Sequence, residues 1–373
     1  MRIVLAPDSF KGSATALEVC RAMKKGILEA CPHAEIIMAP VTDGGEGLVE
    51  NLAAACDGEI VELSVMGPIG RTVKAKYANL PGGEAVIEMA QASGLTLLTE
   101  AERDPRKTTT YGVGQMILDA LDRGCRRFII GLGGSATNDG GCGMAAALGY
   151  EFLNANGQEI ESGGGSLGDL VQIRADKVDQ RLADADFVAA CDVRNPLCGE
   201  NGASYVFGPQ KGATDEDIRV LDENLSHLAD IIERDLNKDV RDVPGAGAAG
   251  GLGAGCVAFL GGRLEEGIRL VSERLQLESK IKSADLVFTG EGRLDSQTLS
   301  GKAPFGIASL ANKYHVPSVI IAGDADPQIS IEGVSEIIGI KTDGMTSEYA
   351  KEHVQQLVTE AASKAMKIII GDR

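Results

Sequence analysis

Five acidic residues follow short apolar runs of the sequence, at the positions where strands would end. They are Asp8, Asp43, Asp192, Glu291 and Asp295. One such acid alone most often caps a helix or forms a turn, but five in the same type of position indicate a shared role. Phosphoryl transfer requires carboxylates that hold Mg²⁺, a basic group on the transferring phosphoryl and an acid that positions the attacking hydroxyl. The sequence contains a candidate for each part.

Basic residues accompany these acids. Lys11 follows the first acid, Arg293 lies between Glu291 and Asp295, and Lys302 starts the next helical pattern. The segment that ends at Lys302 has the spacing of a Walker A motif but lacks its first glycine and its final Ser or Thr, so it is not a P-loop. A lysine is unfavourable in the first turn of a helix because of the helix dipole. Its place there therefore favours a role in anion binding over a purely solvated side chain.

Two glycine-rich segments offer backbone N–H groups that could bind a phosphate. The first, Gly131-Leu-Gly-Gly-Ser-Ala-Thr-Asn-Asp-Gly-Gly141, follows a predicted strand, and the second covers residues 245–255. The first also matches the dinucleotide-binding pattern, with Glu151 twenty residues further on. Glu151 would lie inside a strand, however, and the helix starts late, so a Rossmann dehydrogenase ranks below a phosphate or oxyanion site. Glycines that serve only tight turns are a further alternative.

The candidate site residues divide into four roles. The metal candidates are Asp8, Asp43 and Glu291, and the nucleotide candidates are Gly131, Gly133, Gly134, Ser135, Gly253 and Lys302. The substrate candidates are Ser9, Arg293 and Asp192, and the catalytic candidates are Asp192, Asp295 and Lys11. Which acid holds Mg²⁺, which acid is the base and which glycine segment holds ATP stay open.

Alternating strands and helices at both ends of the chain predict parallel βα units. We expect one discontinuous α/β domain, residues 1–60 plus 283–373, with an inserted mixed α+β domain at 61–282. The strand at 286–288 should open into a charged loop, at the end where ligands bind in such sheets. Strands are also expected at 3–6, 35–39, 59–65, 73–77, 85–89, 127–130, 187–191, 318–322 and 336–340. Helices are expected at 17–31, 113–121, from 214, after the glycine-rich loop 245–255, and as one last helix over 350–368.

Composition narrows the class of protein. The 373 residues include 36 basic and 54 acidic ones, a net charge of -18 that disfavours nucleic acid and anionic membrane surfaces. No apolar run approaches the ~18 residues of a membrane span. The chain opens on a short strand pattern and not on a signal peptide, which predicts a cytoplasmic protein. The chain has eight cysteines without a CxxC pair and only four histidines, which disfavours a zinc site and a Ser-His-Asp hydrolase.

Six motifs in order resemble those of the type I glycerate kinases. They are Ala6-Pro-Asp-Ser-Phe-Lys-Gly-Ser13, Asp43-Gly-Gly-Glu-Gly47, the segment 131–141, Cys191-Asp-Val-Arg-Asn-Pro-Leu197, Phe207-Gly-Pro-Gln-Lys-Gly212 and Thr289-Gly-Glu-Gly-Arg-Leu-Asp295. The resemblance runs from residue 1 to the last helix. It implies ATP- and Mg²⁺-dependent phosphorylation of D-glycerate, commonly to 2-phosphoglycerate, in glyoxylate, glucarate or related carbon catabolism. It also implies a flavodoxin-like domain and an inserted domain likened to restriction-endonuclease folds.

Two other functions remain as alternatives to a glycerate kinase. One is a non-catalytic protein that closes two domains on a sugar acid, and the other is a kinase of another small hydroxy acid. The 2- or 3-phosphoglycerate product and a homodimer are also left open.

Overall fold

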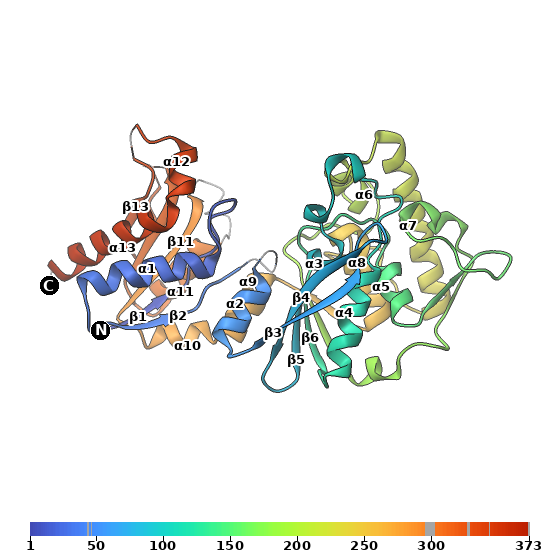
Figure 1. The fold of residues 1–373 in the computed structure, drawn as a ribbon, viewed down its shortest axis with the longest axis horizontal. Helices are drawn as coiled ribbons and strands as arrows, with labels where there is room; N and C mark the ends of the chain where they lie inside the picture. The colour runs from blue at the N-terminus through green and yellow to red at the C-terminus, as the bar shows by residue number, and fades with distance from the viewer. Residues whose placement is uncertain (43–44, 46, 295–302, 327–328, 343, 372–373) are drawn as a thin grey trace. The chain divides into compact units, whose positions relative to one another are not determined.

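The computed structural model of the chain describes residues 1–42, 45, 47–294, 303–326, 329–342 and 344–371. The chain forms two compact units (Figure 1). Unit 1 comprises Met1–Asp43, Glu50–Ala55 and Ile268–Arg373, and unit 2 comprises Gly44–Val49 and Cys56–Gly267. Each unit contains a sheet with parallel strands and helices packed on it, which confirms the predicted mixed α/β class. The predicted domain limits remain a proposal.

Unit 1 contains one sheet with the strand order β13-β12-β11-β1-β2, in which every pairing is parallel. Its strands are β1 (Arg2–Leu5), β2 (Glu35–Met38), β11 (Leu286–Leu294), β12 (Ser318–Ala325) and β13 (Val334–Gly339). Its helices are α1 (Ala16–Ala30), α10 (Leu277–Lys282), α11 (Ala303–Lys313), α12 (Ser347–Glu352) and α13 (Val354–Gly371). Two helices have residues in both units, α2 (Leu48–Ala55) and α9 (Gly267–Arg274).

Helices cover both faces of the unit 1 sheet. On one face, α1 and α13 pack on alternate strand residues such as Ile3, Leu5 and Phe288. On the other face, Ala308 of α11 packs on Ile320. Burial on both faces explains why these strands appear in the sequence as short continuous apolar runs.

Unit 2 contains a six-stranded sheet with the order β10-β9-β6-β5-β4-β3. β3, β4 and β5 form antiparallel hairpins, whereas β5, β6, β9 and β10 are parallel. The strands of the unit are β3 (Glu59–Met66), β4 (Thr72–Leu80), β5 (Glu84–Glu88), β6 (Arg127–Gly131), β7 (Glu151–Leu153), β8 (Gln172–Arg174), β9 (Asp186–Ala190) and β10 (Arg263–Glu265). Its helices are α3 (Ala90–Ser93), α4 (Tyr111–Asp122), α5 (Cys142–Ala147), α6 (Ala203–Phe207), α7 (Asp215–Leu236) and α8 (Ala248–Leu260). β7 and β8 pair separately.

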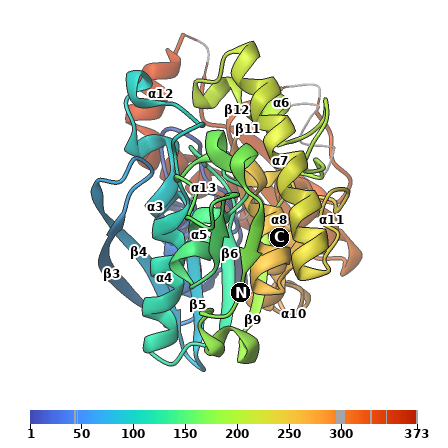
Figure 2. The same ribbon diagram turned by 90° about the vertical axis from the view of Figure 1, so that its right-hand side faces the viewer.

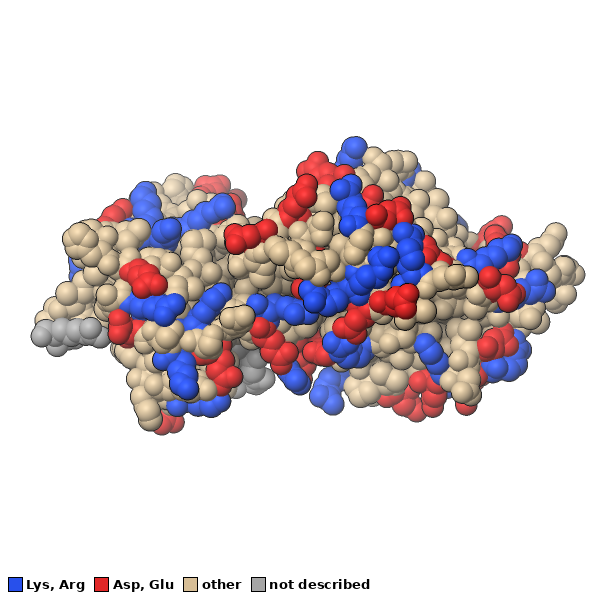
Figure 3. Space-filling model, turned by 90° about the horizontal axis from the view of Figure 1, so that it is seen from below, with Lys and Arg blue, Asp and Glu red and all other residues tan. Residues whose placement is uncertain are grey.

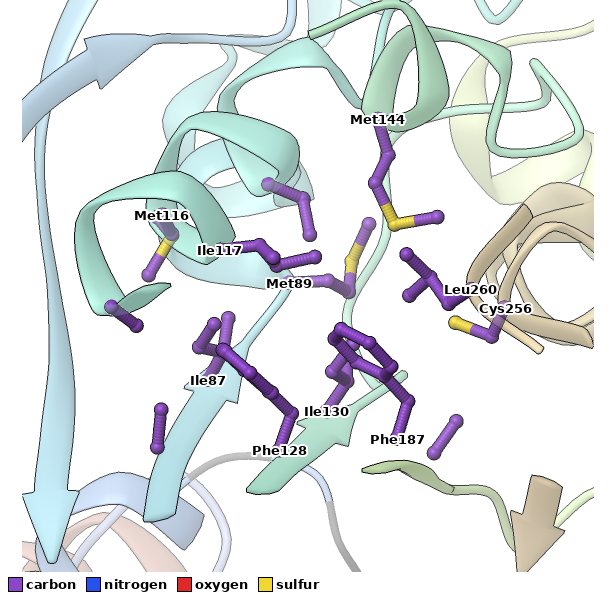
Figure 4. Packing of buried hydrophobic residues seen from close by; sticks show 14 of the residues in the cluster. Ile87, Met89, Met116, Ile117, Phe128, Ile130, Met144, Phe187, Cys256 and Leu260 are labelled. Atoms are coloured by element: carbon purple, nitrogen blue, oxygen red, sulfur yellow. The ribbon is translucent and has the colours of Figure 1, made fainter. Parts of the chain in front are cut away.

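The main core of unit 2 lies between the sheet and the helices α4 and α8 (Figure 4). Phe128 of β6 and Phe187 of β9 stack with ring centroids 4.6 Å apart. Ile117 of α4 and Cys256 of α8 belong to the same buried cluster. Figure 2 shows α4, α5 and α8 beside the strands β5, β6 and β9. The loops at the carboxyl ends of these strands are therefore held by a well-packed base.

Helix starts follow their sequence signals closely. Thr15 and Glu18 form the predicted capping box of α1, and Thr214 forms one with Asp217 at α7. Three boundary predictions were wrong. β11 does not end at residue 288 but continues through Leu294, because β12 pairs with it as far as Ala325. α8 starts at Ala248, inside the segment 245–255, although Ala249, Gly250 and Gly251 have non-helical backbone angles, and the last helix is divided at His353.

The surface charges and the cysteines agree with what the composition predicts. On the face drawn in Figure 3, Lys and Arg side chains are interleaved with Asp and Glu side chains. All eight cysteines are free thiols. Among the described helices, none combines the length and the apolar character needed to cross a bilayer.

Candidate active site

In unit 1, the carboxyl end of β1 lies beside the middle of β11, because Leu5 pairs with Phe288 and β11 continues to Leu294. The Asp8 N–H donates to the Gly290 carbonyl oxygen at 2.8 Å, so the parallel ladder continues past the end of β1. This register places Asp8 next to Glu291, which is buried. The Asp8 carboxylate accepts a hydrogen bond from the Ser9 N–H at 2.6 Å. The structure thus brings together two of the predicted metal candidates and one substrate candidate.

The basic candidates of unit 1 lie near the two acids: Lys11 in the loop after β1, and Arg293 in β11. A Cβ atom on Gly292 would lie 3.4 Å from the Lys11 nitrogen, so the loop after β1 runs directly against β11. Lys11 and Arg293 are both exposed. Arg293 is a strand residue paired in register with Asp324 of β12, and not a loop residue as the sequence pattern predicted. Asp43, Asp295 and Lys302 lie outside the described residues, so their roles remain predictions.

In unit 2, the loop 131–141 starts at Gly131, the last residue of β6. Its tip, Gly133 and Gly134, is exposed, whereas Ser135 is buried. No acceptor among the described residues takes a hydrogen bond from the main-chain N–H groups of Gly133, Gly134 or Ser135. Successive N–H groups that remain available at the end of a strand are what an anion-binding concavity requires.

The Gly45 backbone lies against this tip. A Cβ atom on Gly133 would be only 2.8 Å from the Gly45 Cα. The glycine at 133 is therefore required by a backbone contact within unit 2. A larger residue at this position would clash with Gly45. Its effect on anion binding could then not be separated from the effect of that clash.

The second half of the loop is buried and bonded to its surroundings through polar groups. The Asp139 carboxylate accepts hydrogen bonds from the N–H and hydroxyl of Thr110, both at 2.8 Å, and from the N–H groups of Gly141 and Gly143, both at 3.2 Å. Burial raises the pKa of Asp139, and these hydrogen bonds oppose that shift. The Lys211 ammonium donates to the Thr137 carbonyl oxygen at 2.7 Å. This part of the loop is a fixed support, and only the tip is exposed.

The second glycine-rich segment packs on the first. A Cβ atom on Gly250 would lie 1.9 Å from the Thr137 carbonyl oxygen, and one on Gly253 would lie 2.3 Å from the Gly245 carbonyl oxygen. Ala249, Gly250 and Gly251 all have positive φ, so α8 begins with a left-handed turn. Close backbone packing therefore accounts for the small residues here, including the nucleotide candidate Gly253.

Asp192 follows β9 and is exposed. Its carboxylate accepts a hydrogen bond from the Gly267 N–H, the first residue of α9, at 2.8 Å. The residues after Asp192 contact the same glycine-rich segment, since the Gly247 N–H donates to the Asn195 carbonyl oxygen at 3.0 Å. The predicted base therefore also caps a helix, which is the simpler role that an acid in this position can have.

Comparison with known proteins shows which family these motifs define. The model of the glycerate kinase family matches residues 3–370. The chain belongs to the glycerate kinase family. Glycerate 2-kinase of Escherichia coli K12 is 47% identical over 378 residues, covering 100% of this chain and 99% of the relative. Glycerate kinase of Halalkalibacterium halodurans is 52% identical over 323 residues, covering 86% of this chain and 85% of the relative. The crystal structure of putative glycerate kinase 2 from Salmonella typhimurium LT2 matches with a TM-score of 0.91 at 45% identity, covering 100% and 99% of the two chains.

Sequence reasoning did not select Glu88 or Lys211, which are among the buried charged residues of this glycerate kinase family member. Glu88, the last residue of β5, is 5% exposed and accepts a hydrogen bond from the Val49 N–H at 2.9 Å. It occupies the same type of position as the five predicted acids, but the apolar residues around it conceal it within the strand pattern. Lys211 is 1% exposed. Only its place in the motif 207–212 could have drawn attention to it.

The donor set of unit 1 suits a magnesium ion that is shared with a nucleotide. Within the part of the chain that the structure describes, no three His, Cys, Asp or Glu side chains are grouped to hold a metal by themselves. Mg²⁺ in phosphoryl-transfer sites, however, is held by one or two carboxylates, with phosphate oxygens and water completing its shell. Asp8, just after β1, and Glu291, beside it in β11, fit that requirement.

Proposed function

We propose that the chain is an ATP-dependent kinase that transfers the γ-phosphoryl group of ATP to a hydroxyl of D-glycerate, with 2-phosphoglycerate as the product. The observation that carries this proposal is the family match over residues 3–370, which includes every loop described above. The name of the Escherichia coli relative, glycerate 2-kinase, favours the 2-phosphate. We propose that the enzyme is cytoplasmic and has no nucleic-acid or membrane partners. Whether it forms a homodimer is left open.

Unit 1 is proposed to be a flavodoxin-like domain. Numbered within the unit, the strand order β2-β1-β11-β12-β13 is 2-1-3-4-5, which is the order of that fold. In such sheets the ligand binds where the strand order reverses, here between β1 and β11. Asp8 and Glu291 lie at that point. We retain 1–60 plus 283–373 and 61–282 as the limits of the two domains.

The roles follow from chemistry and position. The loop tip at 133–135 binds phosphate oxygens through its N–H groups, with Gly131, Gly253 and Lys302 as further nucleotide candidates. Asp8, Asp43 and Glu291 are the candidates for holding Mg²⁺, which neutralises the charge on the phosphates when it is bound. Arg293 and Ser9 bind glycerate, because a guanidinium offers a carboxylate two parallel hydrogen bonds. Lys11 contacts the transferring group, and Asp192 or Asp295 accepts the proton of the attacking hydroxyl.

A coupled assay of ADP release with D-glycerate and Mg·ATP tests the proposal. Turnover is expected, and phosphorus NMR of the product should show the 2-phosphate. Tight glycerate binding without turnover would favour the non-catalytic sugar-acid-binding protein. Turnover with another hydroxy acid but not with glycerate would change the substrate and leave the kinase assignment intact.

A further inference from the structure

The most unusual buried group outside the candidate residues is Lys211. It lies at the end of a short turn after α6, where a cation would ordinarily reach solvent, yet it is 1% exposed. Its ammonium donates to the Thr137 carbonyl oxygen at 2.7 Å. Burial lowers the pKa of Lys211 to about 7, and the neighbouring Asp139 carboxylate opposes this shift. Burying an ammonium costs free energy that an apolar residue of similar length would not cost.

The Thr137 carbonyl lies where three segments meet. The turn 209–211 supplies Lys211, the start of α8 supplies Gly250, and the loop 131–141 supplies Thr137 itself. The Thr137 hydroxyl and the Asn138 side-chain oxygen are buried and have no hydrogen-bond partner among the described residues. The hydrogen bonds that the Asp139 carboxylate accepts fix the chain just after this point, and the Lys211 contact fixes the peptide before it. Unpartnered buried polar atoms are rare, which indicates that this conformation is imposed on the loop.

We propose that Lys211 is a positioning residue for nucleotide binding, an inference that rests on the proposed role of the loop 131–141. By holding the Thr137 carbonyl inward, Lys211 prevents that peptide from turning its oxygen toward an incoming phosphate. The N–H groups at 133–135 are then presented to the anion in one arrangement before it binds. Preorganised donors bind more tightly because ordering the loop no longer opposes binding.

Lys238 provides a matched control within the same unit. It is a half-buried lysine whose ammonium, among the described residues, donates to the main-chain carbonyl oxygens of Val257 and Ala258, at 3.1 and 2.9 Å. Burial lowers its pKa as well. These carbonyls lie near the end of α8 and not in the loop 131–141. Lys238→Met therefore reports the general cost of removing such a lysine.

The test compares Lys211→Met, Lys211→Gln and Lys238→Met in the full chain, with melting temperature, ATP affinity by calorimetry and steady-state kinetics. Lys211→Met should raise Kd and KM for ATP about tenfold and leave KM for glycerate within about twofold, a split expected when one substrate's binding is weakened. Lys211→Gln, which keeps a neutral donor, should recover part of the affinity, and Lys238→Met should leave both KM values unchanged.

Three results would overturn the inference. Unchanged ATP affinity in folded Lys211→Met would leave only a structural lysine, as would equal increases in both KM values. Failure of both Lys211 variants to fold, while Lys238→Met folds, would also assign Lys211 to stability alone. A wild-type protein that binds ATP but lacks turnover with glycerate would contradict the proposed reaction and not the role of Lys211, because calorimetry measures that role directly.

Discussion

The glycines of unit 1 and unit 2 look alike in the sequence but meet different physical requirements. In the loop after β1, Gly12 has φ of +75°, and apart from its chain neighbours no described residue has an atom within 4 Å of a Cβ built on it. At the start of α8, Gly250 has φ of +68°, and its Cβ would lie 1.9 Å from the Thr137 carbonyl oxygen. Conformation alone requires the first glycine. The second is required by conformation and also by backbone-to-backbone packing.

The same contrast applies to the charged groups. Around β1 and β11, Lys11 and Arg293 are exposed, and the parallel register of the two strands brings Asp8 beside Glu291. In unit 2, Asp139 and Lys211 are buried and bonded to the backbone. We infer that unit 1 supplies most of the side chains that can act on a substrate, whereas unit 2 supplies Asp192 and a rigid backbone. The buried charges of unit 2 maintain the shape of that backbone.

The largest expected effect is that of Gly250→Ala. A left-handed alanine costs ~1 kcal/mol or more, and forcing a methyl group into a filled space adds ~1–3 kcal/mol. We therefore expect a loss of ~3 kcal/mol in the free energy of unfolding, against ~1 kcal/mol for Gly12→Ala, which has the conformational cost only. Urea denaturation of both variants measures the difference. Equal losses would contradict the distinction between packed and open glycines.

Asp192→Asn should have the next largest effect. Asparagine keeps a side-chain oxygen that can accept the hydrogen bond from Gly267, so the helix cap and the melting temperature should be preserved. Loss of a general base should lower kcat by ~10²-fold, with KM for ATP nearly unchanged. Steady-state kinetics at saturating Mg·ATP measure this.

A kcat within a few-fold of wild type in Asp192→Asn would assign Asp192 to helix capping only. The base would then be Asp295 or no side chain at all, which a loose phosphoryl-transfer transition state permits. Asp192→Ala is the matched control. It removes the cap as well, so only this variant should also lose stability.

Much of this arrangement could be predicted because it depends on local patterns. Apolar periodicity located most of the strands, and acids or glycines after them indicated the sheet edge at which we propose the chemistry. The extension of β11 could not be predicted, because Gly290 and Glu291 are kept in the strand by pairing with β12, which lies elsewhere in the sequence. The burial of Lys211 likewise depends on contacts with Thr137, which is 74 residues away in the chain.

Glu291→Gln should sharpen the assignment of unit 1 to metal binding. Replacing a buried carboxylate by an amide removes the charge that attracts Mg²⁺ but nearly preserves the volume. We expect the Mg²⁺ concentration for half-maximal activity to rise about tenfold, as for loss of one ligand from a site of one or two carboxylates. Magnesium titration of Asp8→Asn, Asp43→Asn and Glu291→Gln compares the three candidates. Unchanged metal dependence in all three would remove the assignment.

The smallest effects should come from relieving left-handed strain at residues other than glycine. His315 in unit 1 has φ of +56° and is exposed just after α11, whereas Ala249 in unit 2 has φ of +52° and is 7% exposed within the main core. Glycine adopts this conformation without steric cost, so His315→Gly should stabilise the protein by ~0.5–1 kcal/mol. Ala249→Gly gains the same relief but loses a buried methyl group worth ~0.8 kcal/mol, so its net change should be near zero. Urea denaturation of both variants measures these changes. Equal stabilisation by both would mean that the packing around the start of α8 is looser than the contacts of Gly250 indicate. The contrast between the two units would then be weaker at that point.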